Sequence, residues 1–446
     1  MSQRSKENNM LTGVIWKELT LFFLPIAAGT LFQQLYNAID AIIVGKFVGT
    51  EALAAVGGSP AVIVNLIISI FVSLTTGSAV IVAQLYGAGN IRELKRAVGT
   101  GVSFFAVLGL VITLLCEPLT GAMLRVLKTP QETMADAATY LYIYFAAFPA
   151  LIVMNAQSGI LRACGDSRNP FIYMLIGCVT NIILDLVFII VFKMGVAGAA
   201  WATDISILVN MLLTTYKLCR TEESYKLETA FMKPRKHIIG QMMEIGIPSA
   251  LSGAMYGISN AILQASVNAL GTAYVAGWAL SGKIDGIYWA TVSAAGSAIT
   301  TFAGQNYGAK LMDRVRKTAS ASFGVFEPAT VILCALVLLF GRDMLPLFTD
   351  DPLVIDITMK VIIYFVPFYV IWTAIEILSG IMRGCGAVKV PVLINAVCVC
   401  LFRVVWVMTV CRIHPSLFNV SICYGISWVI CLICMTLYFL KWRKTV

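Results

Sequence analysis

The sequence predicts an all-α polytopic membrane protein with twelve transmembrane helices in two pseudo-symmetric six-helix bundles. Of its 446 residues, 59% are hydrophobic and only 12% are charged, which excludes a soluble domain of this size. Twelve segments are long and apolar enough to cross a bilayer. Short motifs of the first half recur in the second, which indicates an internal duplication.

Each expected span has about 20 residues or more, the length that a hydrocarbon core of about 30 Å requires. The basic residues 1–18 contain no cleavable signal sequence, so we expect the first helix to act as an uncleaved signal and anchor. In chain order, the expected spans are roughly 19–47, 52–83, 94–117, 135–161, 169–192, 196–217, 240–270, 273–303, 316–340, 358–382, 389–411 and 418–440.

The charges of the loops predict the orientation. With these spans, 23 of the 32 Lys and Arg residues lie on the side of the N-terminus. Because cytoplasmic loops are enriched in Lys and Arg, we expect both termini in the cytoplasm. The net charge of +9 follows from this bias and calls for no nucleic-acid partner.

The two halves share sequence at a constant offset. SGILRACG at 158–165 recurs as SGIMRGCG at 379–386, and QLYGA at 84–88 recurs as QNYGA at 305–309. Six spans are an even number, so both repeats should run the same way and be related by an axis along the membrane normal. We therefore expect an N-terminal bundle (1–217), a cytoplasmic linker (218–238) and a C-terminal bundle (239–446).

Cysteine and histidine give little support to an enzyme. Most of the twelve Cys lie within spans, where the residue behaves as a small apolar group. The CxxC of Cys431 and Cys434 has no second pair nearby, and the two histidines lie at helix ends. We expect no catalytic residues, no metal site and no cofactor.

Ionisable residues within the spans predict a site. Asp40 and Tyr36 are i, i+4 neighbours on one helix face, as are Asp185 and Asn181. At 1.5 Å per residue, both carboxylates lie roughly 10 Å below the outer membrane surface, the depth also expected for Thr203. A carboxylate at such depth is costly and normally serves a function, so we predict a cation or proton site; the alternative is that Asp40 reaches interfacial water.

The duplication supports a functional role for these carboxylates. Asp40 aligns with Leu263 and Asp185 with Trp406, so the acidic pair belongs to the N-terminal bundle alone. Oxygen ligands suit Na⁺, and two adjacent carboxylates suit reversible proton uptake, so the residues serve either ion. Asp204 points about 100° away from Thr203 and is left outside the site.

The C-terminal bundle has its own intramembrane charges. Lys283, Asp285 and Arg403 are expected to form a charged network, in which Asp285 pairs with Lys283 or Arg403. Glu376 is expected to face a cavity between the bundles, where it would favour cationic substrates. In the first span Pro25 interrupts the hydrogen-bond ladder, and we expect the helix to bend or straighten there.

The chain resembles the multidrug and toxic compound extrusion (MATE) family along nearly its whole length. The resemblance rests on LYNAIDAIIVGK (35–46), GSAVIVAQLYGA (77–88), GSAITTFAGQNYGA (296–309) and LRACGDSRNP (161–170). The predicted cation-site residues match those of the DinF-like branch, in which a proline similar to Pro25 bends the first helix. The resemblance further implies a drug cavity lined by Gln34, Asn155 and Met174. The chain departs from the NorM branch, whose cation site has a carboxylate in helix seven.

The resemblance implies a monomeric secondary antiporter in the lipid bilayer of the bacterial cytoplasmic (inner) membrane. It would export amphipathic, often cationic organic compounds in exchange for H⁺ or Na⁺. The alternative is a lipid-linked oligosaccharide flippase of the same superfamily. Such flippases are expected to have several intramembrane Arg and additional helices, whereas this chain has only Arg403 within its spans.

Overall fold

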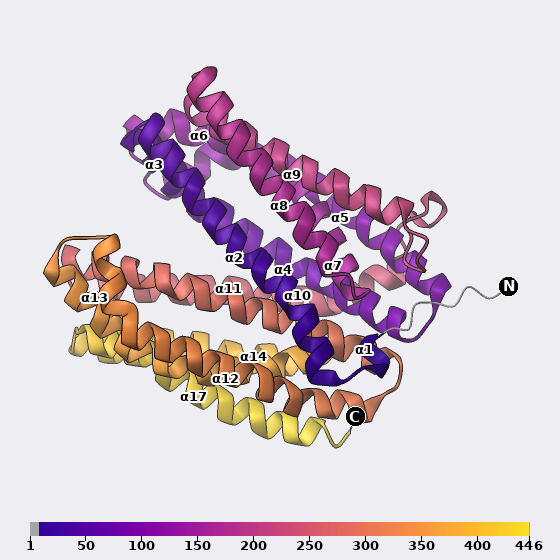
Figure 1. Cartoon of the computed structure of the whole chain (residues 1–446). Helices are drawn as coiled ribbons and strands as arrows, with labels where there is room; N and C mark the ends of the chain where they lie inside the picture. Colours follow the sequence, from indigo (N-terminus) through magenta and orange to yellow (C-terminus); the bar gives the residue numbers. More distant parts are fainter. Residues whose placement is uncertain (1–8, 446) are drawn as a thin grey trace. The chain divides into compact units, whose positions relative to one another are not determined.

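The computed structural model describes residues 9–445, except the side chains of residues 50, 53 and 54. Helices joined by short turns make up this part of the chain, and no strand occurs in it (Figure 1). The basic residues Arg4 and Lys6, expected on the cytoplasmic side, lie outside the described residues.

The described chain forms two compact units. The first unit comprises Leu24–Ala250 and contains most of α2 (Ile15–Phe47), α3 (Thr50–Gly57), α4 (Ser59–Gly87), α5 (Ile91–Val126), α6 (Gln131–Ala146), α7 (Phe148–Ala163), α8 (Arg168–Asp185) with its π-helical continuation (Leu186–Val191), and α9 (Gly195–Arg220).

The second unit comprises Asn9–Phe23 and the chain from Leu251 onward. It contains α1 (Asn9–Thr12), most of α10 (Lys236–Asn268), α11 (Thr272–Gly308), α12 (Met312–Met344), α13 (Pro352–Phe365), α14 (Tyr369–Gly384), α15 (Lys389–Asn395), α16 (Phe402–Trp406) and α17 (Leu417–Trp442). π-Helical segments at Ala396–Leu401 and Val407–Cys411 join α15, α16 and the following turn into one rod.

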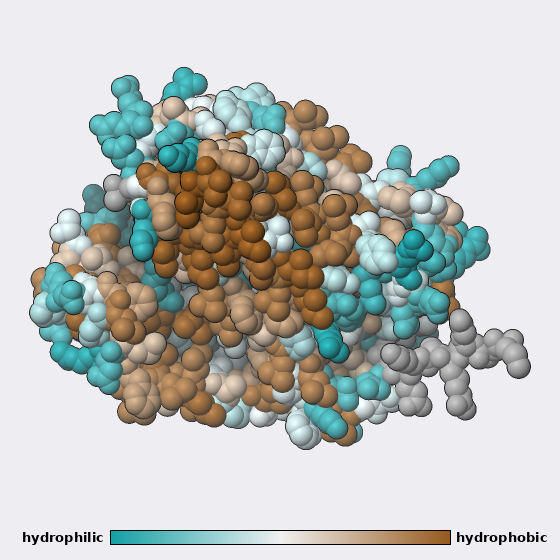
Figure 2. Space-filling model, turned by 45° about the horizontal axis from the view of Figure 1, so that its top comes forward, coloured by the Kyte–Doolittle hydropathy of each residue, from teal (hydrophilic) through white to brown (hydrophobic). Residues whose placement is uncertain are grey.

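The apolar helices confirm a polytopic membrane fold. Among the described residues, nine helices are long and apolar enough to cross a membrane, and the bent pair α6 and α7 makes a tenth. Helices α10 and α11 have 33 and 37 residues and are also long enough to span, so the segments correspond to the predicted twelve. Exposed apolar side chains follow the helices, as Val107, Leu110 and Leu114 do on α5. Figure 2 shows a broad hydrophobic surface with hydrophilic residues gathered mostly at its margins.

The internal duplication is visible in the backbone. Gly165 and Gly386, which are 221 residues apart, both adopt positive φ angles, 90° and 82°, in the turns after α7 and α14. Only glycine adopts this conformation without strain. π-Helical backbone likewise begins directly after Asp185 and directly after its counterpart Trp406. These two irregularities therefore occur at equivalent positions of both repeats, whereas the π-helical segment Ala396–Leu401 has no counterpart in α8.

The first long helix of each half is shared between the units. Helix α2 belongs to the second unit up to Phe23 and to the first from Leu24, and α10 changes unit after Ala250. Arg314 of α12 holds the start of the chain by donating from Nη2 to the carbonyl oxygens of Met10 at 3.1 Å and Gly13 at 2.8 Å. The chain thus passes between the units within α2 and α10, and the predicted domain borders stay a prediction.

The segment predicted as a linker packs against the first unit. Lys95 of α5 forms an ion pair with Glu228 at 2.6 Å, and the Leu227 amide donates to the Leu218 carbonyl at 2.8 Å. Tyr225 is buried, and its burial, together with nearby acidic groups, raises the pKa of the phenol above its usual range. The segment is therefore ordered along the end of this unit.

Candidate cation-binding site

Three helices of the first unit bring the predicted residues together. Helix α2 carries Tyr36 and Asp40, α8 carries Asn181 and Asp185 near its end, and α9 carries Thr203. The i, i+4 spacing places each pair on one face of its helix. Asn181 and Asp185 are fully buried, and Thr203 is 8% exposed. The site therefore lies inside the unit rather than at its lipid-facing surface.

Hydrogen bonds fix the orientation of these side chains. The Asn181 amide, oriented to satisfy both of its neighbours, donates to Asp185 Oδ2 at 2.9 Å and accepts from the Thr203 backbone N–H at 3.2 Å. The Thr203 hydroxyl donates to the Ala199 carbonyl at 3.0 Å and is also a hydrogen-bond partner of the Tyr36 phenol. Each residue is thus held by another helix or by its own backbone, which preorganises the site.

The two carboxyl groups lie against each other. Asp40 and Asp185 are within hydrogen-bonding contact, which requires one of them to carry a proton or a cation to lie between them. Asp40 Oδ1 and Asp185 Oδ1 are shielded from solvent and accept no N–H or hydroxyl hydrogen bond from the described residues. Unsatisfied buried oxygens of this kind provide acceptors for an ion or a proton.

Asp204 of α9 and two tyrosines of α6 add groups that the sequence prediction omitted. Asp204 is 2% exposed, and its Oδ1 accepts no hydrogen bond from the described residues. It lies close enough to Tyr140 and Tyr144 to interact with both phenols. The rings of these tyrosines stack at 5.9 Å. Their i, i+4 spacing within an expected span was the available signal in the sequence.

The donor set suits a monovalent cation or a proton. No three His, Cys, Asp or Glu side chains converge within residues 9–445, so the carboxylates here act as a pair with neutral oxygens around them. Carboxylate, amide, hydroxyl and phenol oxygens are ligands for hard cations. A paired carboxyl can instead hold one proton, because two adjacent negative charges repel each other.

The residues assigned by resemblance to a drug cavity also lie in the first unit. Met174 packs on α2, where a Cβ added at Gly29 would lie 3.5 Å from its Cε. Asn155 donates to the carbonyl of Leu151 at 2.9 Å, and Gln34 is exposed on α2. Their role in substrate binding stays a prediction.

In the second unit, Glu376 has a cationic partner. Arg383 Nη2 lies 2.6 Å from Glu376 Oε1, and its Nε donates to the Thr300 hydroxyl at 3.1 Å. Glu376 packs directly on Gly296, where an added Cβ would meet its Oε1 at 2.1 Å. The carboxylate is thus neutralised within α14, and its predicted contact with substrates remains a proposal.

The charged network predicted for the second unit is not formed. Asp285 makes no ion pair with Lys283 or Arg403, although the structure describes all three residues. Lys283 precedes Asp285 by two positions on α11, so the two side chains point to different sides of the helix. Arg403 donates to Asn260 Oδ1 at 3.2 Å and to the Ser427 hydroxyl at 3.3 Å instead.

The guanidinium of Arg403 is fully buried among aromatic rings. It lies 3.8 Å from the centroid of the Tyr424 ring and 5.4 and 5.8 Å from those of Tyr256 and Trp428. Cation–π attraction of this kind offsets part of the cost of burying a charge without a carboxylate.

A duplicated helical membrane fold with ionisable groups buried within its spans is typical of a membrane transporter. The sequence model of the MatE family matches residues 25–187 and again 248–409. The chain therefore belongs to the MatE family, and the two matches correspond to the two repeats.

Curated relatives and solved structures agree with this assignment. The probable multidrug resistance protein YoeA of Bacillus subtilis is 26% identical over 85% of this chain and 84% of its own length. The multidrug export protein MepA of Staphylococcus aureus is 23% identical over 77% and 75%. A MOP superfamily transporter from Pyrococcus furiosus, with a TM-score of 0.91 at 23% identity, covers 99% of both chains and shows the same fold.

Proposed function

We propose that this protein is a secondary active multidrug exporter that extrudes amphipathic, often cationic organic compounds in exchange for H⁺ or Na⁺. The contact between Asp40 and Asp185 carries this proposal, because a half-buried and a fully buried carboxyl, each with a shielded and unsatisfied Oδ1, offer acceptors to a coupling ion. The names of the curated relatives support the export of drugs.

Coupling follows from differential affinity. An ion drives export only if it binds the outward-open and inward-open states with different free energies. The site joins α2, α8 and α9, so a movement of α2 would separate Asp40 and Tyr36 from the partners on α8 and α9. We propose that occupancy of the site favours the outward-open state, in which substrate is released.

The protein's location, its oligomeric state and the flippase alternative bear on the same function. We propose a monomer in the bacterial cytoplasmic membrane with both termini in the cytoplasm, as the charge bias of the loops indicates. Export of lipid-linked oligosaccharides is not favoured, because the relatives reported above are named for multidrug resistance or export.

The test is transport of a fluorescent organic cation by everted membrane vesicles that contain the protein. A pH gradient and a Na⁺ gradient are imposed separately, and vesicles without the protein serve as the control. We expect one gradient to drive accumulation above the control, and that gradient names the coupling ion. Equal accumulation in both vesicle types under either gradient would contradict the proposal.

Replacing Pro25 with Ala should slow transport. Proline within a helix costs about 3 kcal/mol relative to alanine, so the substitution favours a straight, uninterrupted α2. We expect the initial rate in the vesicle assay to fall about tenfold or more. Pro118, inside α5, provides the matched control, and Pro118→Ala should retain transport. An unchanged rate in Pro25→Ala would exclude bending at this residue.

A further inference from the structure

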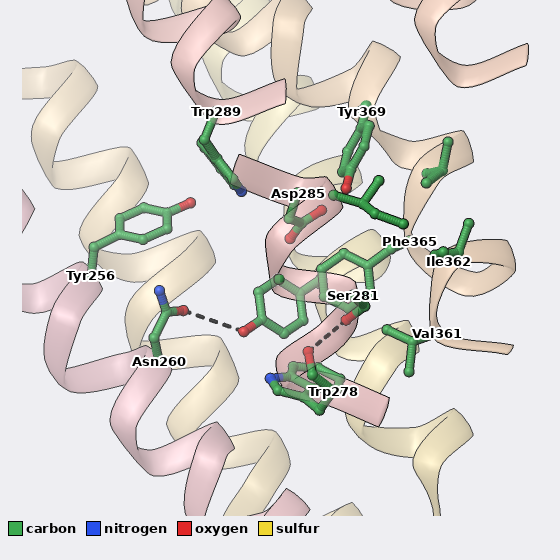
Figure 3. Close-up of a pocket in the computed structure, with 14 residues that line it drawn as sticks. Tyr256, Asn260, Trp278, Ser281, Asp285, Trp289, Val361, Ile362, Phe365 and Tyr369 are labelled. Atoms are coloured by element: carbon green, nitrogen blue, oxygen red, sulfur yellow. Dashed lines mark hydrogen bonds between the residues drawn. The ribbon is translucent and has the colours of Figure 1, made fainter. Parts of the chain in front are cut away.

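The second unit holds a pocket of about 310 Å³ with six aromatic residues among the fourteen that line it (Figure 3). This volume lies at the lower end of small-molecule sites and fits a compact organic molecule better than a bare ion. All its lining residues belong to the second unit. Its aromatic residues are Tyr256, Trp278, Trp289, Phe365, Tyr369 and Tyr424.

One carboxylate lies in this aromatic wall. Asp285, partly buried on α11, is the only Asp, Glu, Lys or Arg among the described residues that line the pocket. In Figure 3 its side chain points among the rings of Trp289, Tyr369 and Phe365. The Trp289 indole lies near the carboxyl, and no Lys or Arg of the described residues forms an ion pair with it. The pocket therefore offers a carboxyl group surrounded by aromatic rings.

The nearby guanidinium is kept out of the pocket. Arg403 is not among the lining residues. It stacks 3.8 Å from the Tyr424 ring and donates to Asn260 Oδ1, which also accepts from the Tyr424 hydroxyl at 3.4 Å. Arg403 thus positions two wall residues without neutralising Asp285. Its charge is held by rings and neutral oxygens, so the carboxylate remains available to a ligand.

We propose that this pocket binds a compact organic ammonium ion, with its charge near Asp285 and its substituents against the aromatic rings. Aromatic faces attract cations that have lost part of their hydration, and a carboxylate adds a direct ionic contact. Apolar substituents on the nitrogen bury surface against the same rings. This inference deepens the proposed function, on which it rests, by giving the second unit a substrate site separate from the ion site at Asp40 and Asp185.

The test compares two ligands of similar shape by calorimetric titration of the purified full-length protein in nanodiscs. Benzyltrimethylammonium is the cation, and 2-methyl-1-phenylpropan-2-ol is a neutral alcohol of nearly the same size. We expect the wild type to bind the cation at least about tenfold more tightly than the alcohol. In Asp285→Asn this preference should disappear. The control Asp313→Asn, which removes a highly exposed carboxylate on α12, should bind as the wild type does.

A second variant covers the case in which Asp285→Asn does not fold. Trp278→Leu removes one ring, and it should weaken binding of the cation about threefold or more while changing binding of the alcohol less. Equal affinity of the wild type for both ligands, or an unchanged cation preference in a folded Asp285→Asn or Trp278→Leu variant, would overturn the inference.

Failure of the proposed function is measured separately. Asp40→Asn and Asp185→Asn should bind benzyltrimethylammonium at this pocket even though they lose ion-driven transport in vesicles. Cation binding at Asp285 without gradient-driven export would overturn the proposed coupling and leave the pocket assignment intact. Gradient-driven export with no cation preference at the pocket would overturn the pocket assignment and leave the proposed coupling intact.

Discussion

Replacing Asp40 with Asn should lower the initial rate of ion-driven export at least about tenfold, since coupling energies of 1–3 kcal/mol correspond to 5- to 150-fold effects. Asparagine keeps the shape and the hydrogen-bonding capacity of the side chain but neither carries a negative charge nor exchanges a proton. Asp185→Asn should have the same effect, because the two carboxyls are in contact and act as a pair. The measurement is uptake of a fluorescent organic cation by everted vesicles.

The pairing makes a sharper prediction for the double variant. Residues that act as one unit are not additive, so Asp40→Asn combined with Asp185→Asn should transport no more slowly than either single variant. Asp136→Asn, an exposed carboxylate of α6 in the same unit, serves as the control and should stay within about twofold of the wild type. Normal transport by both single variants would exclude this pair as the coupling site.

Replacing Gly77 with Ala should destabilise the first unit by about 3 kcal/mol. A Cβ at this position of α4 would lie 1.9 Å from the carbonyl oxygen of Met242 on α10, and backbone cannot move aside as a flexible side chain can. The contact is reciprocal, since a Cβ at Gly246 would meet the Leu74 carbonyl oxygen at 2.6 Å. Close approach at small residues is a common basis of helix packing in membranes.

Thermal unfolding of the purified protein provides the measurement for Gly77→Ala. We expect its midpoint to fall by about 5 °C. Gly324→Ala is the matched control, because this glycine also lies inside a helix but an added Cβ would meet no atom within 4 Å. It should leave the midpoint unchanged or raise it slightly, since alanine favours helix more than glycine does. Equal midpoints in both variants would show that α4 and α10 separate at little cost.

The membrane fold and the carboxyl pair could be predicted because the physics of the bilayer restricts the sequence strongly. Spans must be long and apolar, and an ionisable residue inside one is rare enough to indicate a site. Helical spacing then places Asp40 beside Tyr36, and Asp185 beside Asn181, whatever the tertiary packing. The structure brings these residues together with Thr203, as the depth argument predicted.

The features that the sequence did not predict have a common cause. Hydropathy does not tell which neighbouring helix a given helix face contacts. Asp204 was set aside because it points about 100° from Thr203, but α9 is buried on several sides and Asp204 faces α6. Asp285 was expected to pair with Lys283 or Arg403, whereas Lys283 points to another side of α11 and the Arg403 guanidinium is held by rings and neutral oxygens. The passage of α2 and α10 between units likewise has no signature in composition.

The π-helical segments after Asp185 and Trp406 indicate the order of two events in the evolution of the chain. Each accommodates extra backbone in a helix, and it begins after Asp185 in one half and after Trp406 in the other. The same irregularity at equivalent positions indicates that it was present in the single ancestral repeat before the gene was duplicated. The residue that precedes it then diverged, to a carboxylate in one copy and to an indole in the other. The proposed ion site therefore belongs to one copy alone and is built on a backbone feature that both halves share.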